Sequence, residues 1–313
     1  MKKFVEELKL ATESCLGEGV LVDISEVVKR NDTKRLALCI RNRDGIIGRN
    51  IYVEPYYRMF LEDTPIEDVA EKVVEFFRED EAKHNPFRDG LMILDWIKNY
   101  SRVKERLMFR LVNAEANQEY LRDAIRKPYL DLYISIYILV NISADQTGTV
   151  TVTKEMLSVW GVSEDEVFAQ AMENTRKTFP ETVMHINTIV EESLGKDEFR
   201  AYMNAPEETV VQLYVATNNR RIDGAGVMLY EGVLRDVADK LGLKHLVIFL
   251  SSVHELILMP SNPKNEDIPY LQKMVREINA TVVAPDEWLS TNVYHYDREK
   301  DEVLILLPTE ESR

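Results

Sequence analysis

Residues 246–260, LVIFLSSVHELILMP, decide the fold of the C-terminal part of this 313-residue chain. The stretch begins with Leu246–Leu250, which is apolar throughout and is typical of a strand covered on both faces. Ser251 and Ser252 then predict a turn. A second strand of the same kind is predicted over Val253–Met259. The stretch therefore predicts two buried strands of one sheet, joined by a polar turn.

Helix and strand patterns lie on both sides of this stretch. Val227–Leu241 has apolar residues at helical spacing and ends before Gly242, a residue that favours the left-handed backbone found just after a helix. Ser163 and Glu166 form a capping box and predict a helix that continues to about Lys177. We expect further elements as follows: strands at Tyr129–Ile142, Thr149–Thr153, Thr209–Ala216, Asn292–Tyr296 and Glu302–Leu307, and a helix near Asp267–Asn279.

The N-terminal part has helix and strand signals of its own. Lys3–Leu16 is predicted to be an amphipathic helix. Val20–Lys29 and Lys34–Arg41 are predicted to pair as a hairpin, followed by a strand at Asn50–Val53. The next helix has Thr64 as its N-cap and Pro65 at its first position. Its expected buried stripe is Val69, Val73, Val74 and Phe77.

Together these elements predict a mixed α+β protein. We expect an N-terminal α+β region at residues 1–124 and a larger C-terminal region at residues 125–313. In the larger region, helices are expected to pack on a mixed, mostly antiparallel sheet. The polar, poorly periodic residues 195–208 are expected to form a surface linker.

The composition excludes several classes of protein. With 39 Lys and Arg against 54 Asp and Glu, the formal net charge is −15, which disfavours general binding to nucleic acid or to an anionic membrane. The longest apolar-dominated run, Leu130–Ile142, is shorter than the roughly 20 residues that cross a bilayer. Cys15 and Cys39 are too few for a disulfide framework or a thiolate zinc site. Charged residues interrupt the N-terminal stretch before it resembles a signal peptide, so we expect a cytoplasmic protein without a metal or cofactor.

The acidic charge is unevenly distributed. Residues 62–81 contain nine acids and two bases, a net of −7. This run is interpreted as a solvated helix face, with a docking face for a basic partner as the alternative. A basic segment follows it, and on a strand at Glu105–Val112 the side chains of Arg106 and Arg110 would point outward together. These two arginines are expected to pair with the acidic helix at residues 62–81 or to be solvated, and binding of a phosphate or carboxylate is the alternative.

His254 and Glu255 form the most suggestive local motif. His-Glu opens the zinc-protease signature, but that signature needs a second histidine at position 258, which is Leu258. On a strand the two side chains would also point to opposite faces. The pair is therefore interpreted as a hydrogen-bonded anchor of the turn, with the lining of a pocket as the functional alternative. The other histidines, His84, His185, His245 and His295, are scattered without metal spacing.

Gly224 and Gly226 come shortly before a predicted helix, as in a dinucleotide-binding loop. The third glycine of that motif would fall at position 229, which is Leu229. A tight loop is the favoured interpretation, although a helix N-terminus can also hold an anion. The chain contains neither a Walker loop nor a Gly-x-Ser-x-Gly elbow.

Three functional hypotheses follow. The first is a non-catalytic cytosolic binding or interaction protein with a protein or small-molecule partner, since no catalytic signature is complete. The second is a hydrolase-like enzyme with a pocket near residues 218–226 and 251–255, in which His254 acts as general base beside Glu255. Its polar lining would be Asn218, Asn219, Gly224, Gly226, Ser251 and Ser252. The third is an anion-binding module that uses Arg106 and Arg110.

Several long stretches carry a resemblance that covers nearly the whole chain: SSVHELILMP, APDEWLSTNVYHYDREKDEVLIL, NDTKRLALCIRNRDGIIGRNIYVEPYY, RLMFRLVNAEANQEYL, PYLDLYISIYILV and ATNNRRIDGAGVMLYEGVLRDVADKLG. In these stretches the sequence resembles a family of uncharacterised bacterial proteins, mainly from Gram-positive anaerobes, that is described as a domain of unknown function. The resemblance implies a single full-length unit expressed in the cytosol. It implies no established activity, cofactor or catalytic residue.

Overall fold

The computed structural model describes residues 1–43, 48–83, 93–142, 147–194 and 212–307. The chain divides into two compact units, Met1–Val103 and Lys104–Arg313. Each unit has its own sheet structure and its own core.

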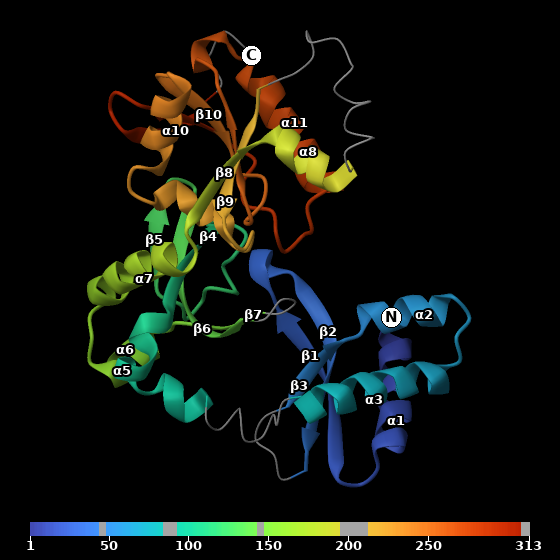
Figure 1. Ribbon diagram of the computed structural model, residues 1–313. Helices are drawn as coiled ribbons and strands as arrows, with labels where there is room; N and C mark the ends of the chain where they lie inside the picture. Colours follow the sequence, from blue (N-terminus) through green and yellow to red (C-terminus); the bar gives the residue numbers. More distant parts are fainter. Residues whose placement is uncertain (44–47, 84–92, 143–146, 195–211, 308–313) are drawn as a thin grey trace. The chain divides into compact units, whose positions relative to one another are not determined.

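The first unit is a three-stranded antiparallel sheet with helices on one face (Figure 1). Its strand order is β1-β2-β3, and Val22 of β1 lies opposite Ile40 of β2. The elements of this unit are α1 (Lys2–Leu16), β1 (Val20–Val28), the 3-10 turn η1 (Arg30–Asp32), β2 (Lys34–Asn42), β3 (Arg49–Tyr52), α2 (Glu54–Leu61), α3 (Ile66–Lys83) and α5 (Tyr100–Val103).

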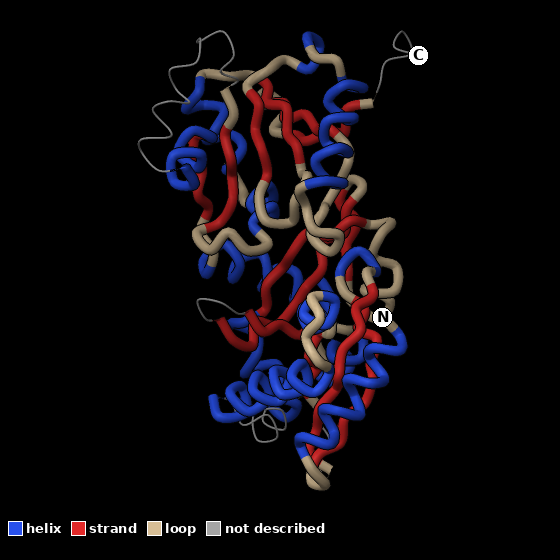
Figure 2. The backbone as a smooth tube through the Cα atoms, turned by 90° about the vertical axis from the view of Figure 1, so that its right-hand side faces the viewer, coloured by secondary structure: helices blue, strands red, loops and turns tan. Residues whose placement is uncertain are grey.

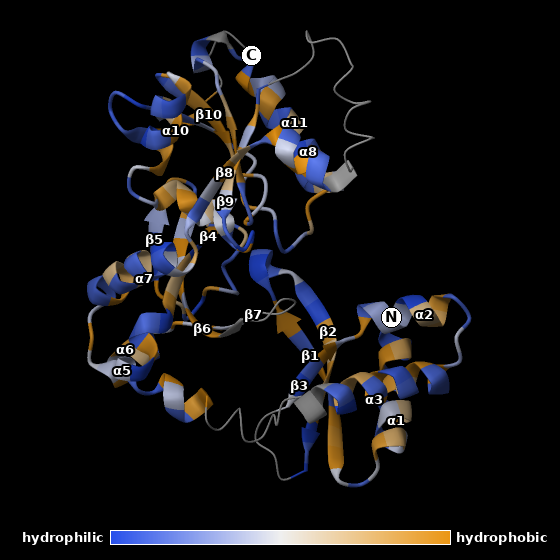
Figure 3. Cartoon of the chain, in the orientation of Figure 1, coloured by the Kyte–Doolittle hydropathy of each residue, from blue (hydrophilic) through white to orange (hydrophobic). Residues whose placement is uncertain are grey.

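The core of the first unit lies between its sheet and the helices α1 and α3. Apolar residues recur on one face of each helix and alternate along each strand, so every element buries one side. The helices in Figure 3 accordingly change between hydrophilic and hydrophobic colouring along their length. The buried residues include Phe4, Val5, Leu8, Val22, Leu38, Ile40, Ile51, Val69, Val73 and Phe77.

The second unit contains two sheets. A four-stranded sheet has the order β4-β6-β5, with β7 also paired to β6, and a six-stranded sheet has the order β13-β12-β10-β11-β9-β8. The strands are β4 (Leu107–Asn113), β5 (Arg126–Tyr129), β6 (Leu132–Ile142), β7 (Thr147–Thr151), β8 (Glu181–His185), β9 (Tyr214–Asn218), β10 (His245–Phe249), β11 (Leu256–Met259), β12 (Val293–Asp297) and β13 (Glu302–Leu306). The helices and 3-10 turns are η2 (Lys104–Arg106), α6 (Lys154–Trp160), α7 (Glu164–Thr178), α8 (Ile186–Leu194), η4 (Gly224–Leu229), α10 (Val233–Leu241), η5 (Pro263–Asn265) and α11 (Ile268–Thr281).

Helices cover both faces of the six-stranded sheet. In Figures 1 and 2, α8 and α11 lie on one face and α10 lies on the other. Leu271 and Val275 of α11 pack on Val247 and Phe249 of β10. Because β10 is buried on both sides, it is the apolar strand that its sequence predicts.

Local capping signals begin two helices of this unit where the sequence indicates. The Ser163 hydroxyl accepts a hydrogen bond from the Glu166 N–H at 3.2 Å and opens α7. The Asp267 carboxylate accepts one from the Tyr270 N–H at 3.1 Å and opens α11. Each cap satisfies an N–H group that has no partner inside the helix. The mixed α+β class is thus confirmed, and the sheet pairings of the described residues are antiparallel.

Several expected boundaries differ from the structure. The division of the chain falls between Val103 and Lys104, before the expected boundary at 124, because β4 pairs with β6 and so belongs to a sheet of the second unit. The strand expected at Tyr129–Ile142 is β6, which begins later, at Leu132. Tyr129 is the last residue of β5, and the chain reverses direction between the two strands at Leu130, whose φ is 54°. The expected linker at 195–208 lies outside the described residues.

Two elements near the Ser251–Ser252 turn begin later than expected. The strand β11 begins at Leu256, because the Val253 backbone is already bonded elsewhere: its N–H donates to the Glu287 carbonyl at 2.8 Å and its carbonyl accepts from the Ala225 N–H at 3.1 Å. The helix α10 begins at Val233, since Gly224–Leu229 forms the 3-10 turn η4 and Gly232 has a left-handed φ of 83°. Within the described residues, none of the helices has the length and apolar character needed to cross a membrane.

Candidate functional site

The turn after β10 lies against the segment that leads into β12. The Leu289 N–H donates to the Ser251 carbonyl at 2.9 Å, and the Ser290 N–H donates to the Leu250 carbonyl at 2.8 Å. These bonds extend the sheet beyond its strands and hold Glu287–Ser290 beside the turn. The polar residues of both segments therefore form one continuous region of the second unit.

His254 is the centre of this region, and all of its hydrogen-bonding groups are engaged. Its backbone N–H donates to the Ser252 hydroxyl at 3.0 Å, and its carbonyl accepts from the Thr217 hydroxyl at 2.7 Å. Its Nδ1 accepts from the Asp223 N–H at 3.3 Å. In the neutral ring the proton is consequently on Nε2, which lies 3.3 Å from the Glu287 carboxylate. His254 thus connects three segments that are distant in the sequence.

Glu255 follows His254 and is mostly buried. Burial raises the pKa of its carboxyl above the ordinary value, and Glu287 acts in the same direction. The charge of His254 and a hydrogen bond from Ser252 oppose this rise. The result is a carboxyl that holds its proton more tightly than an exposed glutamate does.

The predicted pocket residues Asn218, Gly224 and Gly226 have structural contacts. The buried Asn218 side chain donates to the Ile222 carbonyl at 2.8 Å and accepts from the Arg220 N–H at 3.0 Å, which closes the loop after β9. A Cβ atom at Gly224 would overlap the Thr217 hydroxyl and the His254 carbonyl. One at Gly226 would lie 3.0 Å from the Phe109 ring. Close backbone approach is the reason for both glycines.

Ser251 lies in the turn after β10, and Asn219 lies in the loop after β9. Ser251 is buried, and its carbonyl is bonded to Leu289. The Asn219 N–H donates to the Pro180 carbonyl at 3.0 Å. The structure therefore brings together the residues predicted from the two stretches 218–226 and 251–255, and most of their polar groups bond to protein atoms.

Arg110 does not point into solvent as predicted, and that prediction is wrong. Both faces of β4 are buried, and the Arg110 side chain is only 8% exposed. Its guanidinium lies 3.6 Å from the Asp223 carboxylate and 3.9 Å from the centre of the Tyr137 ring. It also donates a hydrogen bond to the Thr149 hydroxyl at 3.2 Å. The ion pair with Asp223 raises the pKa of Arg110 although burial acts against this. Arg110 thereby joins the region around His254 through Asp223.

Arg106 does not share a surface patch with Arg110. It lies in η2, and its guanidinium donates to the carbonyls of Leu139 and Val140 at 3.4 and 3.3 Å. Arg106 is thus bonded to main-chain carbonyls of β6, whereas Arg110 is buried beside Asp223. Anion binding by the two arginines remains a prediction.

A pocket that the sequence reasoning missed lies beside this region. It has a volume of about 360 Å³ and we call it the Asp131 pocket. The Asp131 carboxylate accepts hydrogen bonds from the Tyr294 hydroxyl at 2.7 Å, the Ser290 hydroxyl at 2.8 Å and the Asn292 amide at 3.0 Å. The pocket is lined by Asn113, Glu115, Ala116, Asp131, Trp288, Ser290, Thr291 and Asn292. Its only local signal in the sequence is one charged residue, Asp131, inside an apolar run.

Asn113 completes the frame of the Asp131 pocket. Its amide donates to the Leu289 carbonyl at 3.0 Å, and its oxygen accepts from the N–H groups of Glu115 and Ala116 at 3.0 and 2.8 Å. The end of β4, the β5–β6 turn and the segment before β12 are thereby tied together. The pocket is built from fixed backbone and bonded side chains.

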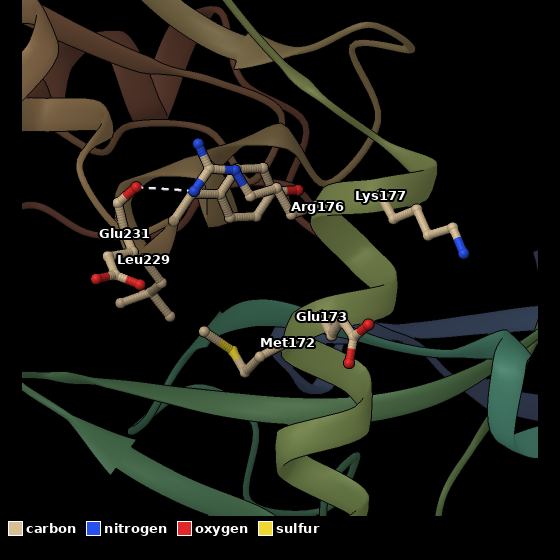
Figure 4. A pocket seen from close by; sticks show the side chains of 7 residues that line it. Met172, Glu173, Arg176, Lys177, Leu229 and Glu231 are labelled. Carbon is tan, nitrogen blue, oxygen red and sulfur yellow. Dashed lines mark hydrogen bonds between the residues drawn. The ribbon is translucent and has the colours of Figure 1, made fainter.

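A second pocket lies between α7 and residues 229–231, with a volume of about 470 Å³ (Figure 4). Arg176 crosses it: the guanidinium donates to the Glu231 carbonyl at 2.8 Å and to the Glu181 carboxylate at 2.8 Å. Figure 4 shows Met172 extending toward Leu229 below Arg176, while Lys177 points away. The central cation of this pocket is therefore already bonded to protein oxygen atoms.

The described residues contain no group of three or more His, Cys, Asp or Glu side chains that could hold a metal ion.

Fold and site thus define a two-unit α+β protein with a polar pocket beside a hydrogen-bonded histidine turn. The chain matches the family of unknown function DUF5688 over residues 1–298 and belongs to that family. No curated protein and no solved structure matches this chain.

Proposed function

We propose that this chain is a non-catalytic binding protein and that the Asp131 pocket takes a small ligand carrying a protonated amine. The charge of the lining carries the proposal, because the lining residues that the structure describes include two carboxylates, Glu115 and Asp131, and neither Lys nor Arg. Trp288 adds an aromatic surface, which attracts organic cations. Such a pocket favours an ammonium group over a carboxylate or phosphate.

Preorganisation supports binding at this place. The Asp131 carboxylate already has three donors from Ser290, Asn292 and Tyr294, so its position does not depend on a ligand. Glu115 is exposed and is available to pair with the ligand amine at the rim. A ligand that meets fixed groups loses less conformational entropy on binding than one that must order them.

The region around His254 supports binding more than catalysis. A general base needs a free ring nitrogen near the proton that it removes. Both nitrogens of His254 are engaged, Nδ1 by the Asp223 N–H and Nε2 by Glu287. The nearby Ser252 hydroxyl accepts from the His254 backbone. We place this binding function in the cytoplasm, where the free thiols Cys15 and Cys39 would remain reduced.

Thermal denaturation with a matched set of small molecules tests this proposal. The probes are primary and quaternary amines, carboxylates of the same size and neutral polyols. Amines are expected to raise the melting temperature in a concentration-dependent way, because they bind the native state. Glu115→Gln should reduce that shift, whereas the exposed control Glu155→Gln on α6 should retain it. Equal shifts by carboxylates, or full retention in Glu115→Gln, would contradict the proposal.

Hydrolysis at His254 is the second candidate function, and Glu255 is the observation that favours it. A carboxyl with a raised pKa next to a histidine is a common arrangement in general acid–base catalysis. The test is a panel of chromogenic esters, phosphoesters and glycosides. Activity should be lost in Glu255→Gln and His254→Asn but kept in His185→Asn, with circular dichroism confirming that each variant folds. An inactive parent protein would leave no support for this candidate.

A further inference from the structure

Two histidines that are far apart in the sequence meet on the six-stranded sheet. His245 begins β10 and His295 lies in β12, the neighbouring antiparallel strand. In the register, His245 is opposite Asp297 and His295 is opposite Val247, so the histidines are diagonal neighbours on one face. His245 Nδ1 lies 3.0 Å from His295 Nε2, and both side chains are partly exposed.

We propose that His245 and His295 bind one divalent transition-metal ion of the zinc, nickel and copper type, with water molecules as the remaining ligands. Two imidazole nitrogens bound to one tetrahedral zinc at about 2.0–2.1 Å lie about 3.3 Å from each other. The observed separation of 3.0 Å is within a few tenths of an ångström of that value. Small rotations of the two rings would therefore direct both nitrogens at one ion.

The sheet fixes the two ligands before the ion arrives. β10 and β12 are paired along five residue positions, and β10 is also bonded to β11 on its other side. Val247 and Val293, on the same face, are buried under α11. The backbone positions of the two histidines are therefore set by the core, and binding requires only side-chain movement.

The local charge also favours a cation. Asp297 is opposite His245 in the register of β10 and β12 and adds a negative charge beside the two histidines. Lys300 opposes cation binding, but its ammonium lies 3.8 Å from Asp297 and is partly neutralised there.

Imidazole ligands suit zinc, nickel and copper, and copper(II) generally binds a given site more tightly than zinc. Magnesium and calcium prefer oxygen ligands. The site is thus expected to discriminate between these two groups of ions. This selectivity distinguishes metal binding at His245 and His295 from non-specific attraction of cations to an acidic protein.

Isothermal titration calorimetry with zinc chloride, on the full chain after chelator treatment, tests the proposal. We expect one zinc ion per chain at this site, and His245→Gln or His295→Gln should each weaken zinc binding by more than about ten-fold. His185→Gln is the matched control, because His185 lies on β8 and its Nδ1 accepts from the Asn187 N–H. Magnesium chloride should give no heat at the same concentrations.

Melting temperatures measured with and without zinc separate a loss of zinc binding from a loss of stability. The zinc-induced rise in melting temperature should disappear in His245→Gln and His295→Gln and persist in His185→Gln. Zinc binding that is unchanged in both variants would overturn the proposal, as would the absence of zinc binding in the parent protein. In either case His245 and His295 would be a hydrogen-bonded pair only.

Discussion

The Arg110 guanidinium and the Asp223 carboxylate lie 3.6 Å apart, with only 8% and 10% of their side chains exposed. Asp223 has a left-handed φ of 51° and its N–H donates to His254, so the pair links β4 to the turn after β10. A buried charge that loses its partner retains the full cost of its lost hydration. The pair therefore makes the region around His254 sensitive to the loss of either residue.

Asp223→Asn is expected to lower the free energy of unfolding by about 3–5 kcal/mol, the usual cost of leaving one buried charge without its partner. Asparagine tolerates the left-handed backbone, so the loss would not come from strain. Urea denaturation followed by circular dichroism measures this change. In the double variant Arg110→Met with Asp223→Asn, the loss should be smaller than the sum of the two single losses. Strict additivity would show that the two charges do not interact.

Arg110 marks the limit of what local sequence patterns predict. Local signals were sufficient for the β1–β2 hairpin, the start of α7 at Ser163 and the apolar strand β10, since their causes lie within a few residues. Whether both faces of β4 are covered depends on segments far along the chain. The alternation of Leu107, Phe109 and Leu111 with Arg110 therefore indicated an exposed face that the structure does not have.

The Asp131 pocket and the His245–His295 pair could not be predicted from the sequence, for a related reason. Tyr129–Ile142 reads as a continuous strand, and no glycine marks the reversal at Leu130, so Asp131 had no visible partners. Likewise His245 and His295 meet only through the register of β10 and β12. Long-range register and loop conformation, which short sequence patterns do not encode, determine both sites.

Gly224→Ala is expected to destabilise the protein by about 1–3 kcal/mol, the common cost of overpacking. The new methyl group would overlap the Thr217 hydroxyl and the His254 carbonyl, and one of these must move. The hydrogen bond between Thr217 and His254 would be strained as a result. Gly19→Ala is the control, because a Cβ atom there would have no neighbour within 4 Å. Equal melting temperatures for both variants would contradict the assignment of Gly224 as a close-packing position.

Glu255 is expected to make the protein less stable as the pH rises. Its pKa is raised in the folded state, so the folded state binds this proton more tightly than the unfolded state does. The resulting stabilisation is complete below the ordinary glutamate pKa and is lost as the pH rises through the raised folded pKa. Glu255→Gln should therefore exceed the parent in stability at pH 7 and differ less from it near pH 4, as measured by urea denaturation.

Asp165 provides a comparison of opposite sign for this pH experiment. Its hydrogen bond with Lys127 lowers the pKa of the Asp165 carboxyl. Its stabilisation is present above the ordinary aspartate pKa and is lost as the pH falls through the lowered folded pKa. Asp165→Asn should accordingly be less stable than the parent at pH 7, with the difference disappearing in acid. If Glu255→Gln followed the same direction as Asp165→Asn, the buried-carboxyl interpretation of Glu255 would be wrong.

Asp131→Ala is expected to be among the most damaging substitutions in the second unit. It removes the acceptor of three side chains: the hydroxyls of Tyr294 and Ser290, two residues that are 0% and 1% exposed, and the Asn292 amide. Each buried donor left without a partner costs about 1–3 kcal/mol, so a total loss of roughly 3–5 kcal/mol is expected. Asp131→Asn should cost less, since the amide can still accept from Ser290 and donate to the Tyr294 oxygen.

Tyr294→Phe removes one hydrogen bond of the Asp131 pocket but leaves the charge of the pocket in place. It removes only the 2.7 Å hydrogen bond to Asp131 and should cost about 1.5–3 kcal/mol, the range for bonds to a charged group. The carboxylate would keep Ser290 and Asn292 as partners, so amine binding should persist in this variant while it is lost in Asp131→Ala. Urea denaturation and the amine-induced thermal shift, measured on the same samples, distinguish the two effects. A variant Asp131→Ala that is as stable as the parent would show that this carboxylate does not organise the pocket.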